Sequence, residues 1–429
     1  MSYGIVWYKN DLRTFDHLPL KKASEKYTKL IGVFIFDPSY FDANYQNIAR
    51  FSEKRKNFLA GCVKSLQKEW ENYGAPFLVF YEKTESVMLK LKEQFPDSEI
   101  FASNEYGTEE LKSIKIAEKF FKVNCFESAL LIPINKLPFQ IENLPDFFTA
   151  YRKKVEYKLA PIHTIKNEPI KAHKIDFKHE DYPSLKSEVL IFKPGSQAGK
   201  ERVDYYFFDS ELVLKYKETR NGLLGSDFST HFSPWLATGC ISAAYIYNKL
   251  KDFEDEFESN ESTYWVFFEL LWRDYFKLSL KKFGRAFFIP QGIANKKIAY
   301  RKNEQLFENW TNGKTGVPFI DANMRELKET GFMSNRGRQN VASYLVKDLN
   351  LDWRLGAYWF ESQLLDYDVS SNWGNWLYVA GIGADPRENR YFNIHKQAGM
   401  YDPQALYQKN WLTELRELSV AEIMERNKF

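Results

Sequence analysis

The sequence predicts two unlike domains: an N-terminal α/β domain built on a parallel, Rossmann-like sheet, and an all-α C-terminal domain. Three observations lead to this prediction. Short apolar runs alternate with helical stretches over residues 1–125, prolines crowd residues 131–200, and helical periodicity dominates from about Glu201 onward. Strands separated by helices need crossover connections, which favour a parallel sheet covered on both faces. We therefore expect domains over residues 1–130 and 201–429, with residues 131–200 as a connector.

Five apolar runs in the first domain are the predicted strands: Ile5–Tyr8, Leu30–Phe36, Pro76–Tyr81, Glu99–Ala102 and Lys122–Phe126. Helical stretches lie between them. In one of these, apolar residues recur at spacings of three, four and seven: Phe51, Phe58, Leu59, Cys62, Val63, Leu66 and Trp70. Such spacing places an apolar face along one side of a helix.

The connector should be mostly irregular, because prolines recur from position 133 to position 194 and break regular elements. A short helix is expected near Pro145–Tyr157. In the last domain, offsets of three, seven and eleven predict a helix through Trp265, Phe268, Trp272 and Phe276. Further helices are expected over residues 323–348 and 354–366.

Composition excludes several classes of protein. Lys and Arg total 60 and Asp and Glu total 57, so the net charge of +3 excludes a histone-like or strongly acidic chain but allows a local basic face. Three cysteines are too few for a disulfide framework or a four-thiolate cluster. The N-terminus lacks a signal-peptide pattern and no apolar run reaches about eighteen residues, so we expect a cytoplasmic protein without a membrane span. The aromatic content of 17%, with 11 Trp, suggests stacking or electron transfer.

Two glycine-containing segments fail as phosphate sites. Gly313–Gly316 resembles the end of a phosphate-binding loop, but the glycine that such a loop requires upstream is Glu308 here. Gly381–Gly383 lacks the third glycine of a dinucleotide fingerprint. The 6 histidines show no metal-ligand spacing, so no metal site is predicted.

Two segments of the last domain suit a bound ligand. The hydroxyl cluster Ser229–Ser233 precedes Pro234 and a helical pattern, where it could bind an anion such as a diphosphate or simply cap the helix. Glu269 and Trp272 are three residues apart and share a helix face. A carboxyl beside an indole suits a stacked base, although Glu269 could instead pair with Arg273 in a core helix.

Two more segments follow. In Gly331–Gln339, two arginines flank a glycine and suit phosphate contact, buried ion pairing or a solvated basic turn. In Asp366–Trp376, small polar residues alternate with Trp, which is typical of a ligand lining or of a turn-rich surface loop.

Taken together and in this order, these segments resemble the photolyase/cryptochrome family, and within it the DASH cryptochromes. The resemblance covers nearly the whole chain, through Trp7–Arg13, Phe228–Ala237, Glu269–Phe276, Thr330–Ala342 and Asp366–Gly383. The runs Thr330–Gln339 and Arg387–Asn393 are characteristic of the DASH branch.

The resemblance implies that the helical domain binds FAD in a bent, U-shaped conformation. It implies that the FAD phosphates are held by Tyr216, Ser229, Thr230, His231, Phe232 and Ser233. Arg338 and Asp366 would form an ion pair beside the isoalloxazine ring. Asn372 would sit at flavin N5, where an amide accepts a hydrogen bond without adding charge, and Asp368 would approach another polar edge of the ring or the ribityl chain.

The family reaction is light-driven repair of cyclobutane pyrimidine dimers by an electron from reduced FAD. By resemblance, the lesion would contact Glu269, Trp272, Asn335 and Arg336, with Glu269 most effective when burial keeps it protonated. Gln339 and Tyr378 stand where photolyases acting on duplex DNA often carry Met and Trp. This smaller, more polar pocket predicts weak repair of duplex DNA and better repair of single strands, which carry no flipping cost.

The family passes electrons to excited flavin along three Trp. Trp376 and Trp353 match the first two, and Tyr300 takes the outer position, with Trp359 and Trp373 as other possible exits. Family members often carry a second pigment, commonly methenyltetrahydrofolate, for which Glu105 is the candidate ligand. Residues 124–130 depart from the usual Gly-containing motif there.

The main alternative is a blue-light photoreceptor that binds FAD and nucleic acid without significant repair; Glu269 and Trp272 favour repair. A second alternative is a non-catalytic single-strand or RNA-binding protein, against which the net charge of +3 argues. Repair of the (6-4) photoproduct would call for histidines near Asn335–Gln339, where there are none. We expect a monomer whose partner is single-stranded or locally unpaired DNA containing pyrimidine dimers, with RNA as a further candidate.

Overall fold

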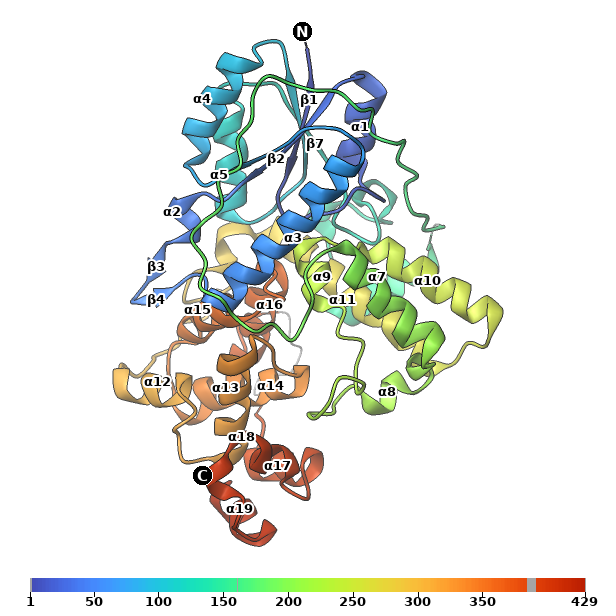
Figure 1. Cartoon of the computed structure of the whole chain (residues 1–429). Coiled ribbons are helices and arrows are strands. Elements are labelled where there is room, and N and C mark those ends of the chain that lie inside the picture. Colours follow the sequence, from blue (N-terminus) through green and yellow to red (C-terminus); the bar gives the residue numbers. More distant parts are fainter. Residues whose placement is uncertain (1, 160, 384–390, 429) are drawn as a thin grey trace.

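The computed structural model describes residues 2–159, 161–383 and 391–428 (Figure 1). The signature residues Arg387–Arg390 lie outside this described part. A parallel sheet forms the core of the N-terminal domain, with its strands in the order β5-β2-β1-β6-β7. These strands are β1 (Gly4–Tyr8), β2 (Leu30–Ile35), β5 (Phe77–Phe80), β6 (Glu99–Ser103) and β7 (Val123–Phe126). The predicted α/β class is confirmed, and each predicted apolar run forms a strand.

Helices cover both faces of the sheet. They are α1 (Leu18–Lys26), α3 (Glu53–Asn72), α4 (Thr84–Gln94) and α5 (Thr108–Ala117). Val6 and Tyr8 of the central strand β1 pack on the side of α1 and α3. Ile5 and Trp7 face the opposite layer, with α4 and α5. Because successive side chains of a strand point to opposite faces, both layers are buried, and this explains the near-continuous apolar runs in the sequence.

A short hairpin was not predicted. It follows α2 (Pro38–Phe41) and consists of β3 (Asn44–Tyr45) and β4 (Ile48–Ala49), paired antiparallel. Its turn residues Gln46 and Asn47 have φ values of 46° and 66°. Strands of two residues are too short to show a period-two pattern, so the hairpin leaves no hydrophobic signal in the sequence. It contacts α15 (Trp353–Gln363) of the helical domain.

The connector runs over the surface of the α/β domain (Figure 1). Its helix α6 (Phe148–Tyr157) lies within the expected Pro145–Tyr157 stretch. Farther along, Val79 of the outer strand β5 donates to His179 O at 2.9 Å, and Asp181 N donates back to Val79 O at 2.9 Å. The connector thereby pairs with an edge strand that would otherwise be open.

The C-terminal domain is helical in its described part. Its helices are α7 (Ser196–Asp204), α8 (Tyr216–Thr219), α9 (Ser233–Thr238), α10 (Ala243–Glu256), α11 (Glu261–Phe283), α12 (Glu304–Thr311), α13 (Pro318–Thr330), α14 (Asn335–Ser343), α15, α16 (Val369–Ala380), α17 (Ile394–Tyr401), α18 (Leu406–Trp411) and α19 (Val420–Arg426). The predicted helix through Trp265 and Phe276 is part of α11. Its N-terminus is fixed by a capping box between Asn260 and Thr263.

The helices expected over residues 323–348 are α13 and α14, with a break between them. Gly331, with φ of 73°, ends α13 in the left-handed region, and Ser334 caps the start of α14 by accepting from Gly337 N. The last turn, Tyr344–Asp348, is a π-helix. This break turns Asn335 and the residues after it toward the cavity described below.

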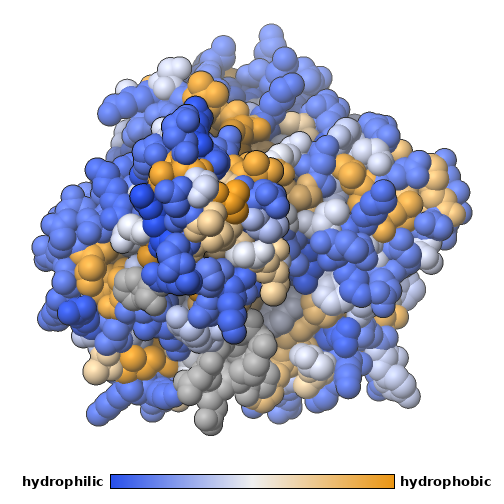
Figure 2. All heavy atoms as spheres, turned by 90° about the horizontal axis from the view of Figure 1, so that it is seen from below, coloured by the Kyte–Doolittle hydropathy of each residue, from blue (hydrophilic) through white to orange (hydrophobic). Residues whose placement is uncertain are grey.

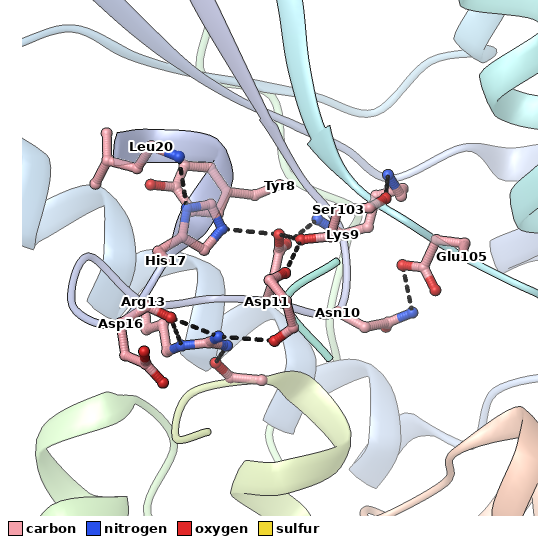
Figure 3. A network of polar contacts seen from close by, with 12 residues as sticks. Tyr8, Lys9, Asn10, Asp11, Arg13, Asp16, His17, Leu20, Ser103 and Glu105 are labelled. Atoms are coloured by element: carbon pink, nitrogen blue, oxygen red, sulfur yellow. Dashed lines mark hydrogen bonds and ion pairs between the residues drawn. The ribbon is translucent and has the colours of Figure 1, made fainter. Parts of the chain in front are cut away.

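The two domains meet at the carboxyl end of β1. Leu12 N donates to Thr238 O at 3.1 Å, and the buried Arg13 guanidinium donates to Gly239 O at 2.9 Å. Asp16 accepts from Ser242 across the same contact. Figure 3 shows Arg13 and Asp16 beside a second buried group, in which Asp11 contacts His17 at 2.8 Å. The domains are therefore joined by buried polar contacts.

Gly239→Ala is expected to lower the free energy of unfolding by about 3 kcal/mol, because two costs add. Gly239 has φ of 70°, and an added Cβ would overlap the backbone of Asn10 and Asp11. A left-handed non-glycine residue costs about 1–2 kcal/mol, and overpacking about 1–3 kcal/mol. Urea unfolding measures the loss. Gly316→Ala is the control, since Gly316 has φ of 85° but open space around its Cβ; equal losses in the two variants would contradict the clash.

At the helical end, the surface is mainly hydrophilic, with apolar residues in small separate groups (Figure 2). Among the residues that the structure describes, no helix combines the length and the apolar character needed to cross a bilayer.

Candidate functional site

A cavity of about 500 Å³ opens among α8, α9, α11, α14 and α16. Of the predicted site residues, it is lined by Tyr216, Ser229, Thr230, His231, Phe232, Ser233, Glu269, Trp272, Asn335, Arg338, Gln339, Asp366, Asp368 and Tyr378. A smaller cavity of about 100 Å³ shares several of these residues and adds Asn372 and Trp376. We call the two together the central cavity. Segments that are far apart in the sequence thus line one hollow.

An ion pair lies in the wall of the central cavity. Arg338 Nη2 of α14 contacts Asp366 Oδ2 at 2.8 Å, and Ser233 Oγ donates to the same oxygen at 2.6 Å. The Asp366 side chain is 2% exposed, and its Oδ1 is buried without a hydrogen-bond partner. A buried carboxylate needs such partners, and the open oxygen is a free acceptor for a ligand.

The hydroxyl cluster does not cap a helix. The N-cap of α9 is Phe232, which makes no side-chain capping bond, and Ser233 Oγ points to Asp366 instead. Arg202, to which the sequence assigns no role, holds the preceding loop by donating to the carbonyls of Ser226, Ser229 and Thr230 at 2.7–3.0 Å. Arg202 therefore holds the backbone of this loop, while the hydroxyls of the loop line the cavity. Burial, with Arg202 nearby, lowers the pKa of His231 to about 4, so it is neutral at pH 7.

Glu269 pairs with a residue outside α11, which spacing along that helix cannot identify. Its Oε1 accepts from Arg220 Nη1 at 2.7 Å, so the alternative of pairing with Arg273 on the same helix is wrong. Arg220 also lies over the Trp265 ring, 4.9 Å from the centroid. Burial in the cavity wall raises the pKa of Glu269, and Arg220 opposes this rise. Burial and one guanidinium thus act in opposite directions on the pKa of this carboxyl.

Arg220→Gln is expected to raise the pKa of Glu269 further, because it removes the charge that favours the carboxylate while the burial remains. The carboxylic acid C=O band in infrared difference spectra, followed against pH, measures this. The band should persist to higher pH in the variant than in the parent protein. Glu269→Gln supplies the control that assigns the band. A band that titrates at the same or lower pH in Arg220→Gln would contradict the prediction.

Trp272 forms an aromatic wall. It stacks on Phe148 of α6 with ring centroids 3.8 Å apart and planes at 12°, and it meets the Tyr378 ring edge-on at 6.1 Å. The connector helix therefore backs the indole, which lines the cavity. Arg336 does not line the cavity; it donates to Gln339 Oε1 and to Asn221 Oδ1, both at 3.0 Å.

Asp368 and Asn372 start α16 at the floor of the cavity. Asp368 accepts from Ser371 N at 2.8 Å and from Lys277 Nζ at 2.6 Å. Burial alone would raise the pKa of Asp368, but Lys277, Arg273 and the hydrogen bond from Ser370 together outweigh burial and hold the pKa well below its usual range. Asn372 Nδ2 donates to Ala357 O at 3.0 Å, so its Oδ1 is the acceptor that remains.

The predicted relay residues are buried or half-buried in the helical domain. Trp376 lines the smaller cavity, and Trp353 is fully buried beside Trp373, with ring centroids 5.5 Å apart. Tyr300 is half-buried, and its hydroxyl is buried with no hydrogen-bond partner among the described residues.

Glu105 lies away from the central cavity, at the domain boundary. Figure 3 shows it beside Asn10, which donates to it at 3.5 Å. It lines a hollow of about 50 Å³, whereas sites for drug-sized ligands hold about 300–1,000 Å³. Burial raises the pKa of Glu105 to about 8, with Lys9 opposing. The hollow that Glu105 lines is too small for a folate, so the antenna stays a prediction. A larger hollow of about 350 Å³ lies over β1 and β2 and is also lined by Ala237, Thr238, Leu365 and Tyr367 of the helical domain.

No cluster of three or more potential His, Cys, Asp or Glu ligands occurs within the described residues.

Two family models match the chain. The first, DNA photolyase, matches residues 4–172, and the second, the FAD binding domain of DNA photolyase, matches residues 265–429.

Similar proteins share nearly the whole chain. A cryptochrome DASH from Synechocystis is 43% identical over 96% of this chain and 88% of its own length. A cryptochrome DASH from Xenopus laevis is 41% identical over 96% of this chain and 83% of its own. The crystal structure of a Synechocystis cryptochrome superposes with a TM-score of 0.93 at 41% identity, covering 99% of this chain and 91% of that one. An archaeal photolyase from Sulfolobus tokodaii, solved with two FAD molecules, gives 0.80 at 26% identity, covering 99% and 93%.

Proposed function

Because the chain belongs to the photolyase/cryptochrome family, with DASH cryptochromes among its relatives, we propose that it uses light and FAD to split cyclobutane pyrimidine dimers, preferentially in single-stranded DNA. The observation that carries this proposal is the common cavity. Glu269 and Trp272, which suit a stacked pyrimidine, line the same hollow as the Arg338–Asp366 pair, which suits a flavin.

The residues present fit FAD. The cavity of about 500 Å³ falls in the range of cofactor sites. Ser229 and Thr230 offer hydroxyls to phosphates, and the unpartnered Asp366 Oδ1 is an acceptor for a ring N–H or a ribityl hydroxyl. Asn372 Oδ1 would accept from flavin N5 without adding charge. When bound and reduced, FAD supplies the light-driven electron chemistry.

The chain's own residues would bind and polarise the lesion. Trp272 offers an indole face backed by Phe148, so a base that stacks on it meets a rigid wall. Glu269 in its acid form would donate a hydrogen bond to a pyrimidine carbonyl and stabilise charge developing there. Arg220 would then be released from Glu269 to contact the lesion phosphate.

The preference for single strands rests on Gln339 and Tyr378. Both line the cavity and make its rim more polar than Met and Trp would. Apolar contact in the cavity has to offset the free-energy cost of taking the dimer out of the duplex stack. With Gln339 and Tyr378 in the cavity, a flipped dimer gains less of this contact. In a single strand that cost does not arise.

Anaerobic illumination of the reduced, FAD-containing protein with dimer-bearing oligothymidine tests the proposal. We expect recovery of thymine absorbance, faster for the single strand than for the same dimer in a duplex. Equal rates would overturn the strand preference. Stable flavin photochemistry without any recovery would overturn repair and favour the blue-light photoreceptor.

A further inference from the structure

We propose that the hollow at the domain boundary is a water-filled route along which Glu105 and Glu110 deliver a proton to FAD bound in the central cavity. The hollow of about 50 Å³ adjoins the central cavity, and the residues that line both are Leu236, Ala237, Arg273, Tyr367 and Asp368. One water molecule needs about 10–15 Å³ of such space and two to four polar partners. The hollow therefore has room for a short chain of water molecules.

Polar groups of both domains line the hollow. Those of the α/β domain include Asn10, Asp11, Ser103, Glu105 and Glu110, and those of the helical domain include Ser242, Arg273, Lys277 and Asp368. Asn10 is exposed and donates to the half-buried Glu105 at 3.5 Å (Figure 3). Asp368 also lines both parts of the central cavity. The hollow thus connects a residue at the surface with the floor of the cavity.

Glu105 and Glu110 are the carboxyls of this lining that lack firm protein partners among the described residues. Glu105 has the long contact from Asn10, and Glu110 Oε2 is buried with no hydrogen-bond partner among those residues. By contrast, Asp11 and Asp368 each accept at least two hydrogen bonds. Buried polar groups in proteins are paired with protein groups or with water. Water in the hollow would supply the partners that these two carboxyls lack.

The same two carboxyls hold protons near neutral pH. Burial raises the pKa of Glu105 to about 8, and the charges that face it are Lys9, Glu110, Lys277 and Asp11. Burial also raises the pKa of Glu110 to about 7, and the charges that face it include Glu109, Glu361 and Arg50. A group whose pKa lies near the working pH can both give up a proton and regain it.

Asp368 lies where the hollow meets the central cavity. Lys277, Arg273 and the hydrogen bond from Ser370 hold its pKa well below the usual range, so it stays a carboxylate and carries no proton itself. Its negative charge favours a proton on the water beside it. Bound FAD would fill the central cavity and shield its ring from bulk water, so a proton needs a path through the protein.

The step balances as follows. Conversion of oxidised FAD to its anionic reduced form takes up two electrons and one proton, and a thiol in solution supplies the electrons under light. The O–H bond of Glu105 breaks, the proton passes along the water chain beside Asp368, and an N–H bond forms on the ring. Water at the surface then returns a proton to Glu105. The inference rests on the proposed function for bound FAD but not for dimer cleavage, so failure of repair leaves it standing.

Anaerobic flash illumination of the oxidised, FAD-containing protein with a thiol and without DNA tests the route. Loss of the oxidised flavin absorbance times the electron, and the later spectral shift of the ring times the proton. The double variant Glu105→Gln/Glu110→Gln should slow the arrival of the proton about tenfold and leave the arrival of the electron unchanged. In the parent protein, infrared difference spectra should show transient loss of a carboxylic acid C=O band that is absent in Glu105→Gln.

Two more variants make the test specific, with FAD content and thermal midpoint measured for each. Ala129 lines the hollow, so Ala129→Leu should displace water and slow the proton while both carboxyls remain. Asp348→Asn is the matched control: Asp348 is a part-buried acid with a raised pKa and an unpartnered oxygen among the described residues, but it lines none of the cavities described above. Unchanged proton arrival in the double variant and in Ala129→Leu, or equal slowing in Asp348→Asn, would overturn the route.

Discussion

Replacing Arg338 with Met is expected to lower the free energy of unfolding by about 3 kcal/mol and to abolish FAD retention during purification. The change leaves Asp366, 2% exposed, with Ser233 Oγ as its remaining donor. Breaking a buried pair on one side costs about 3–5 kcal/mol, because a charge stays buried without compensation. The lower end applies here, since the Arg338 side chain is 24% exposed. Urea unfolding and the flavin-to-protein absorbance ratio measure the two effects.

Two further variants make this test specific. Arg325 forms a two-pronged pair with Glu414 at 2.6 and 3.0 Å, but both side chains are well exposed. Arg325→Met should therefore cost at most about 1 kcal/mol. Adding Asp366→Asn to Arg338→Met should recover part of the lost stability, because it removes the uncompensated charge. Equal costs for the two arginine variants, or no recovery in the double variant, would contradict a buried pair.

The sheet was readable in the sequence because its strands are buried on both faces. Such strands appear as apolar runs, and prolines and helical stretches mark where each run stops. The break at Gly331 was harder to read, because apolar periodicity continues on both sides of it and a lone glycine is tolerated within helices. It became visible through the φ of 73° and the packing of Gly331 against Leu365.

The cavity residues and the Arg338–Asp366 pair were predicted by resemblance, whereas other partners of these residues were not. Glu269 and Arg220 are 49 residues apart, and Lys277 and Asp368 are 91 apart. Hydrophobic periodicity carries no information about which charges meet over such separations. Arg202 illustrates the same limit, since it acts on carbonyl groups, which every residue possesses. Local spacing within α11 even favoured the wrong partner, Arg273, because i and i+4 positions are always neighbours on a helix.

Glu269→Ala is expected to slow light-driven dimer repair about a hundredfold, the cost typical of losing one preorganised donor to developing charge. The mechanism requires the acid form of Glu269, because a carboxylate has no proton to donate. Burial raises the pKa of this group above its unfolded value. The acid form therefore predominates below the raised pKa and is lost as pH increases through it. Repair by the parent protein should fall along that alkaline limb.

Glu269→Gln tests whether Glu269 acts as a hydrogen-bond donor or as a negative charge. An amide keeps two N–H donors but cannot ionise, so the variant should retain repair within a fewfold of the parent and lose the alkaline limb. FAD content should be unchanged in both variants, because Glu269 faces Arg220 rather than the Arg338–Asp366 pair. Initial repair rates at several pH values under constant illumination measure this. If the Gln variant were as slow as the Ala variant, or if its repair rate still fell at alkaline pH, Glu269 would act as a carboxylate. Its proposed role as a hydrogen-bond donor in the acid form would then be contradicted.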